Sequence, residues 1–261
     1  MVCTAVFQIG NCKQLCIVCT KQKLLLRTER EETMEYAIRL NAVNNPEASV
    51  RAFATITLGD SFKITNVSVI EGRENKLFVS MPSFRSKERD EHNQAVYKDV
   101  CNPITKEFRE RLYGDTLDLY AEMEQTGKAE VTREVAEEQE PVFTVKVKPF
   151  EREGSNILGL ARIYFEDSFV VSNVSILKGK DKEFIAMPFY KTRQTGKDGK
   201  PQYQDVCFPV TKEFREKLYD TILESYKKER EQTADKGMMQ AVEQAQARGE
   251  IKRQEMSMAF H

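Results

Sequence analysis

Two stretches of the sequence gather basic side chains, which can contact phosphate groups without reading a base sequence. The first stretch contains the cations Arg85, Lys87, Arg89 and Lys98. The second contains the cations Lys191, Arg193, Lys197 and Lys200. Three acidic residues oppose the first set, whereas only Asp198 opposes the second. The cations are candidates for contacts with DNA or RNA. The alternative is that both stretches are ordinary solvated loops.

Aromatic residues accompany these cations. Phe84 lies in the first stretch, and Tyr190 and Tyr203 lie in the second. Such rings can stack on unpaired bases, a contact that contributes about 1–3 kcal/mol per base. Gly196 and Gly199 predict a mobile second loop that can fit the shape of a partner.

A cysteine follows an aspartate at two matching places, Asp99 with Cys101 and Asp205 with Cys207. A thiol near a carboxylate could serve catalysis or metal binding, but no histidine stands beside either pair. A neighbouring carboxylate also raises the pKa of a thiol, which makes the thiol less reactive. We therefore expect both cysteines to be buried packing residues and both aspartates to bond the turn.

Four further cysteines crowd the start of the chain: Cys3, Cys12, Cys16 and Cys19. The spacing of Cys12, Cys16 and Cys19 loosely resembles half of a zinc site, and only Cys3 could complete the four ligands that zinc needs. We favour a different interpretation, in which residues 1–33 lie outside the fold and translation begins at Met34. No metal site and no cofactor is predicted.

The chain repeats itself at a spacing of 106–107 residues, which indicates a duplicated domain. Asp-Ser-Phe at 60–62 recurs at 167–169, and Thr-Lys-Glu-Phe-Arg-Glu at 105–110 recurs at 211–216. The predicted organisation is domains at 35–125 and 142–231, a Glu-rich and in part helical linker at 126–141, and a charged tail at 232–261. The tail is expected to be an exposed helix or disordered.

Alternation of apolar and polar residues predicts half-buried strands in each repeat. The phase of this alternation shifts at Asn66 and Asn173, which predicts a β-bulge in both copies. A helix with an apolar stripe then follows Thr105 and Thr211, which are predicted N-caps. The fold class is therefore α+β, with an antiparallel sheet and a C-terminal helix in each repeat.

The segment between the last long strand and the helix resembles a known family. It reads Met-Pro-Ser-Phe-Arg-Ser at 81–86 and Tyr-Lys-Asp-Val-Cys-Asn-Pro-Ile at 97–104. The second copy reads Met-Pro-Phe-Tyr-Lys-Thr at 187–192 and Tyr-Gln-Asp-Val-Cys-Phe-Pro-Val at 203–210. In this order the motifs resemble the stage V sporulation protein G (SpoVG) family of bacterial septation regulators, over nearly all of each repeat.

The resemblance implies a small, usually dimeric domain that binds DNA and RNA, acts in cell division and sporulation control, and has no catalytic activity. Because family members usually have one domain, we expect the tandem to form a covalent pseudo-dimer. This chain departs from the family at a pair of adjacent basic residues. Only the second of the pair is present, as Arg85 and Lys191, and Phe84 and Tyr190 occupy the first position.

Composition narrows the possible functions. A net charge of −1 excludes a uniformly basic nucleic-acid coat, and no apolar run approaches the ~20 residues of a membrane span. The sequence has no Gly-rich phosphate loop, His-Glu metal pattern or nucleophile–His pairing, so an enzyme and a small-molecule substrate are not predicted. The prediction is a cytoplasmic nucleic-acid-binding regulator. The alternative is a protein–protein module that kept the fold and lost the nucleic-acid surface.

Overall fold

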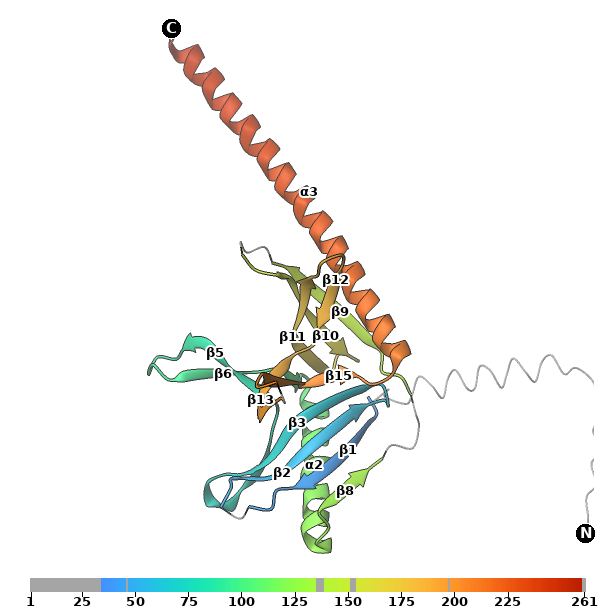
Figure 1. The fold of residues 1–261 in the computed structure, drawn as a ribbon. Helices are drawn as coiled ribbons and strands as arrows, with labels where there is room; N and C mark the ends of the chain where they lie inside the picture. Colours follow the sequence, from blue (N-terminus) through green and yellow to red (C-terminus); the bar gives the residue numbers. More distant parts are fainter. Residues whose placement is uncertain (1–33, 46, 135–138, 151–153, 197, 260–261) are drawn as a thin grey trace, which may run out of the picture. The chain divides into compact units, whose positions relative to one another are not determined.

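The computed structural model describes residues 34–259 except 46, 135–138, 151–153 and 197. The elements of the first repeat are β1 (Tyr36–Ala42), β2 (Val50–Leu58), β3 (Phe62–Glu71), β4 (Leu77–Ser80), β5 (Ser83–Arg89), β6 (Ala95–Asp99), β7 (Cys101–Pro103) and α2 (Lys106–Thr126). A short 3-10 turn at Arg73–Asn75 joins β3 to β4. The strand β8 (Glu130–Arg133) follows α2. The predicted sheet-then-helix order is confirmed (Figure 1).

The second repeat has the same order. Its elements are β9 (Phe143–Pro149), β10 (Ile157–Phe165), β11 (Phe169–Lys178), β12 (Glu183–Ala186), β13 (Phe189–Thr195), β14 (Pro201–Asp205), β15 (Cys207–Pro209) and α3 (Lys212–Ala259). The helix α3 runs without a break into the tail, whereas α2 ends at Thr126 and is capped by Gly127, whose φ of 64° is left-handed. A glycine reaches this φ at no steric cost, and the chain can then turn back.

The two repeats exchange a strand. In the first sheet the strand order is β15-β3-β2-β1-β8, with β4 also on β3. In the second it is β12-β11-β10-β9, with β7 on β11. Thus β7 of the first repeat pairs with β11 of the second, and β15 of the second pairs with β3 of the first. Each sheet therefore contains one strand that the other repeat supplies.

The predicted β-bulges are confirmed at both asparagines. The pairing of β2 with β3 shifts register between Ala54 and Ile56, and Asn66 on β3 has a φ of 61°. The pairing of β10 with β11 shifts in the same way, and Asn173 has a φ of 62°. Asparagine tolerates this left-handed conformation better than most residues, and the bulge lets each strand change its buried face.

Both helices begin where the sequence predicts. The hydroxyl oxygen of Thr105 accepts a hydrogen bond from the backbone N–H of Phe108 at 3.4 Å, and Thr211 accepts one from Phe214 at 3.2 Å. The predicted stripes are buried: Phe108, Leu112, Thr116, Leu119 and Met123 on α2, and Phe214, Leu218, Ile222 and Tyr226 on α3. They close one apolar core that draws residues from both repeats.

The expectation of a partly helical linker is wrong for the part that the structure describes. Residues 130–133 form β8, an edge strand antiparallel to β1, in which Val131 lies opposite Leu40 and is buried. Arg39 and Glu130 form an ion pair of 2.7 Å across this edge. Packing of Val131 and ladder hydrogen bonds outweigh the helix propensity of a Glu-rich stretch. Positions 135–138 and the N-terminal cysteines lie outside the described residues.

Within the described part of the chain, neither α2 nor α3 has the apolar length that a bilayer crossing requires.

Candidate nucleic-acid interface

The two basic stretches form β-hairpins. The sequence predicts loops here, and that prediction is wrong for the strand segments. Strands β5 and β6 make one two-stranded sheet, and β13 and β14 make the other (Figure 1). A two-stranded ribbon has no buried face, so its residues need not alternate between apolar and polar, and the strand signal is missing from the sequence. Each ribbon begins directly after a buried Met-Pro pair, at Met81 and at Met187.

The tips of the ribbons are tight turns. In the first, the Asp90 carboxylate accepts hydrogen bonds from the backbone N–H groups of His92 at 2.9 Å and Gln94 at 2.7 Å. In the second, the N–H of Gly196 donates to the carbonyl of Lys200 at 2.8 Å, and Gly199 has a φ of 73°. These contacts fix the register in which the two strands of each ribbon meet.

A cation faces a tyrosine across each ribbon. Arg85 on β5 lies opposite Tyr97 on β6, and Lys191 on β13 lies opposite Tyr203 on β14. Directly opposite residues of an antiparallel pair point to the same face. Tyr97 is 65 % exposed and Tyr203 is 60 % exposed, so neither ring is used for packing in the core. Both repeats thus present a cation and an open aromatic ring side by side.

A third aromatic residue joins this face in the second ribbon. Phe189 stands two positions before Lys191 on β13, and its ring meets that of Tyr203 edge-on at 5.4 Å between centroids. Phe189 is 57 % exposed. The sequence prediction did not include Phe189 or Tyr97. A strand prediction for these segments would have indicated both residues. Alternation places Phe189 on the same face as Lys191, and antiparallel pairing places Tyr97 opposite Arg85.

The predicted aromatic residues Phe84 and Tyr190 lie on the opposite face of the ribbons. Phe84 lies opposite Lys98, and Tyr190 lies opposite Gln204, to which its hydroxyl donates a hydrogen bond at 2.8 Å. The ribbons therefore separate the three predicted aromatic residues: Tyr203 shares a face with Lys191, whereas Phe84 and Tyr190 do not share a face with the cation–tyrosine pairs.

Intramolecular pairing divides the predicted cations. Lys98 forms an ion pair with Glu88 at 2.7 Å, and Lys200 approaches Asp198 at 3.6 Å. Arg89 donates to a backbone carbonyl of the turn. By contrast, Arg85, Lys87 and Lys191 form no ion pair with the other described residues. Of Arg193 only the backbone is described, on β13, and Lys197 lies outside the described residues.

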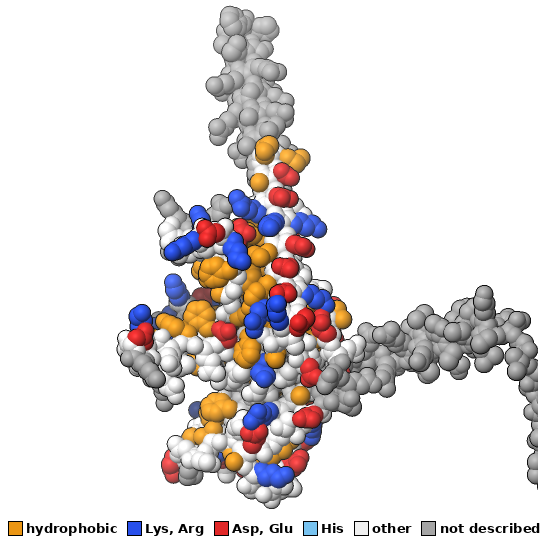
Figure 2. Space-filling model, turned by 45° about the vertical axis from the view of Figure 1, so that its right-hand side comes forward, with side chains coloured by type: hydrophobic (Ala, Val, Ile, Leu, Met, Phe, Trp, Pro, Cys, Tyr) orange, Lys and Arg blue, Asp and Glu red, His pale blue; other side chains and the backbone are white. Residues whose placement is uncertain are grey.

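One face of the molecule carries charges of both signs. On the face shown in Figure 2, Lys and Arg side chains are interspersed with Asp and Glu, and hydrophobic side chains gather in several patches. A mixed surface attracts a polyanion through local clusters and not through a broad positive field. Arg85 and Lys87 of the first ribbon form such a local cluster, and Lys191 of the second ribbon likewise has no ion-pair partner among the described residues.

The two body cysteines are packing residues, as predicted. Both Cys101 and Cys207 are fully buried, and burial raises the pKa of each thiol, with the nearby aspartate acting in the same direction. A thiol held protonated is a poor nucleophile and a poor metal ligand. Among the described residues, no group of three or more His, Cys, Asp or Glu side chains is arranged to hold a metal ion.

Comparison with known proteins places both repeats in one family. A sequence model of the SpoVG family matches residues 34–122 and again residues 141–228. A protein of Treponema denticola is 36 % identical over 83 residues, which are 32 % of this chain and 81 % of that protein. A protein of Clostridium beijerinckii is 33 % identical over 87 residues, which are 33 % of this chain and 88 % of that protein. Both carry the name "Putative septation protein SpoVG". The matches span well over half of the 261 residues, so the chain belongs to the SpoVG family and contains two copies of its domain in tandem.

Proposed function

We propose that this protein is a cytoplasmic, non-enzymatic regulator that binds single-stranded DNA or RNA through the exposed tyrosine faces of its two hairpins. The relatives named for septation support a role in cell division, and the family resemblance extends that role to sporulation control in a host that forms spores. Such a protein would regulate by binding a nucleic acid and would catalyse no reaction of its own.

The observation that carries this proposal is the repeated cation–tyrosine pair, Arg85 with Tyr97 and Lys191 with Tyr203. An unpaired cation can contact a backbone phosphate, and an open ring can stack on the adjacent base. The ring of Phe189 beside Tyr203 offers the second hairpin a further stacking surface. Duplication provides two such faces in one chain, and binding at one raises the effective concentration of the other.

Fluorescence anisotropy of the full chain with labelled single- and double-stranded oligonucleotides tests the proposal. The titrations are repeated over a series of salt concentrations, because phosphate contacts weaken as salt rises. One variant removes the cations of the first hairpin, Arg85, Lys87 and Arg89, by substitution with alanine. A second variant removes Lys191, Arg193 and Lys200 in the same way.

A matched control replaces three exposed cations away from the hairpins, Lys76, Lys106 and Lys212. Each variant loses three positive charges, so the net charge of the protein changes by the same amount in all three. A difference in binding then reports the position of the cations. We expect salt-sensitive binding that the hairpin variants weaken and the control does not. Absence of binding at low salt, or equal loss in all three variants, would rule out the hairpins as the nucleic-acid site.

A second candidate function is protein–protein interaction, and one observation favours it. The outer faces of the two sheets expose apolar side chains at matching positions, Phe53 and Phe78 in the first repeat and Leu160 and Phe184 in the second. Each is 39–46 % exposed. Substituting Phe53 and Phe78 with serine should leave oligonucleotide binding unchanged. If cellular function is lost while nucleic-acid binding persists, the interaction module becomes the better interpretation.

A further inference from the structure

A hollow of about 540 Å³ lies between α3 and the turn that joins β11 to β12. Its lining includes the cations Lys178, Lys180, Lys182 and Arg230, the acids Asp181 and Glu183, and Tyr226 and Leu158. The volume falls within the range of about 300–1,000 Å³ that is typical of small-ligand sites. We call this hollow the α3 pocket.

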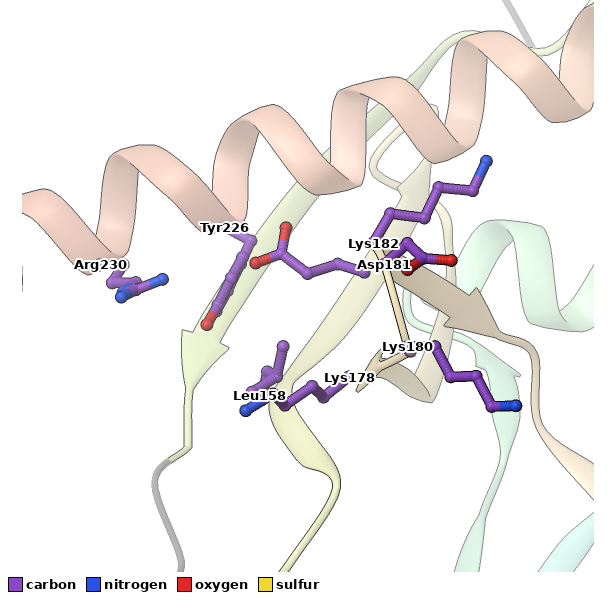
Figure 3. A pocket seen from close by; sticks show the side chains of 9 residues that line it. Leu158, Lys178, Lys180, Asp181, Lys182, Tyr226 and Arg230 are labelled. Atoms are coloured by element: carbon purple, nitrogen blue, oxygen red, sulfur yellow. The ribbon is translucent and has the colours of Figure 1, made fainter.

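The cations of the α3 pocket have no partner within the described part of the chain. None of the four forms an ion pair there, although two acids lie in the same lining. Figure 3 shows Tyr226 and Arg230 projecting from α3 on the side of Leu158 and Lys178, whereas Lys180 and Lys182 point away from them. Lys178, Arg230 and the Tyr226 hydroxyl are therefore the donors placed to meet one ligand.

The first repeat has a matching hollow of the same volume, about 540 Å³, and its charges are neutralised internally. There Arg51 forms an ion pair with Glu71, and the Tyr120 hydroxyl donates a hydrogen bond to Glu124 at 2.7 Å. Burial and the bond to Glu124 raise the pKa of Tyr120 to about 12. The lining of this first hollow carries two cations, Arg51 and Lys128, and two acids, Glu71 and Glu124, so it has no excess charge for a ligand.

Duplication allows a position-by-position comparison of the two hollows. Tyr226 occupies the place of Tyr120. The place of Glu71 is taken by Lys178, and the place of Glu124 by Arg230. Leu158 replaces Arg51, so the internal ion pair is lost as well. All three changes leave the geometry of the fold in place and convert a neutral hollow into a cationic one.

We propose that the α3 pocket binds a phosphate group, with Arg230 and Lys178 as the charged donors and the Tyr226 hydroxyl as a further donor. A guanidinium fork and an ammonium group together match the several acceptor oxygens of a phosphate. The ligand class is a free nucleotide or polyphosphate, and the same chemistry would accept a phosphate of a nucleic-acid strand. The α3 pocket shares no residue with the two hairpins, so phosphate binding there does not depend on nucleic-acid binding by the hairpins.

Isothermal titration calorimetry of the full chain with inorganic tripolyphosphate and with ATP tests this inference, in a buffer that contains sulfate as a competing anion. The test variant is Lys178→Glu with Arg230→Glu. It restores the residues that the first repeat carries at these places, so the fold should tolerate it. The control variant is Lys227→Glu with Lys228→Glu, which makes the same charge change on exposed positions of the same helix.

We expect tripolyphosphate or ATP binding that the test variant weakens at least about tenfold, because two charge-assisted contacts are replaced by repulsion, and that the control leaves nearly unchanged. Failure of both ligands to bind above sulfate, or equal weakening in the two variants, would overturn the inference. If a single-stranded oligonucleotide displaces bound tripolyphosphate from the pocket and ATP does not, the phosphate that the pocket takes belongs to a nucleic-acid strand. The hairpin variants keep pocket binding in either case, which separates this test from that of the proposed function.

Discussion

The rings of Phe62 and Phe165 pack together with 4.8 Å between their centroids, although Phe62 belongs to the first repeat and Phe165 to the second. Both side chains are fully buried. Phe62 also lies on the strand segment of β3 that pairs with β15 of the other repeat. The two repeats are therefore joined through one shared core as well as through their sheets, and this core is incomplete without either repeat.

We expect Phe62→Ala to destabilise both repeats together, by about 3–5 kcal/mol, because it opens a cavity in a shared core. Hydrogen exchange followed by mass spectrometry should show lost protection in β10 and β11 as well as in β2 and β3. The control is Phe53→Ala, which truncates the same residue type at a 44 % exposed position of β2 and should have little effect. Loss of protection confined to the first repeat would contradict a shared core.

Strand exchange also predicts how one repeat behaves alone. A chain of residues 34–141 keeps β7 but loses β11, and its β3 loses β15. Because β7 and β15 occupy matching positions, a second copy of the repeat can supply the missing strand. We expect this single repeat to dimerise and the full chain to be monomeric in light scattering. A monomeric single repeat would count against the tandem as a covalent counterpart of a dimer.

Most of the fold could be predicted from the sequence because each pattern in one repeat could be compared with the same pattern in the other. The phase shifts at Asn66 and Asn173 and the caps at Thr105 and Thr211 each occur twice, and both copies proved correct. The strand β8 was missed because it exists in only one repeat. The first repeat has room for β8 because α2 stops before Gly127. The second repeat has Thr233 at the matching position, and α3 continues through it.

The candidate site was only partly predictable. Charge clustering located both hairpins, but it could not show that Lys98 is paired with Glu88 or that Tyr190 is bonded to Gln204. Side-chain direction decides these contacts, and direction follows from strand register. Register in a ribbon is set by its turn, and the turn contacts of Asp90 carry no hydrophobic signal in the sequence.

Removing the exposed rings should weaken single-strand binding. We expect Tyr97→Ala with Tyr203→Ala to cost about 1–3 kcal/mol for each base that stacks, and to affect duplex binding less, since duplex bases are already stacked. Tyr97→Phe with Tyr203→Phe keeps both rings and should retain binding. Anisotropy titrations at fixed salt measure both. If the phenylalanine variant binds as weakly as the alanine variant, stacking does not explain the role of these residues.

Alkaline pH should destabilise the protein through its buried thiols. Burial raises the pKa of Cys101 and Cys207 above the usual 9.0, so above pH 9 the unfolded chain releases these protons while the folded chain retains them. The unfolded state is then favoured, and each thiol lowers the free energy of unfolding by up to about 1.4 kcal/mol per pH unit. Urea unfolding at pH 7–10.5 should show this fall, and Cys101→Ala with Cys207→Ala should reduce its slope. An identical slope in the variant would show that other groups, such as Tyr36, whose pKa is also raised by burial, account for the alkaline transition.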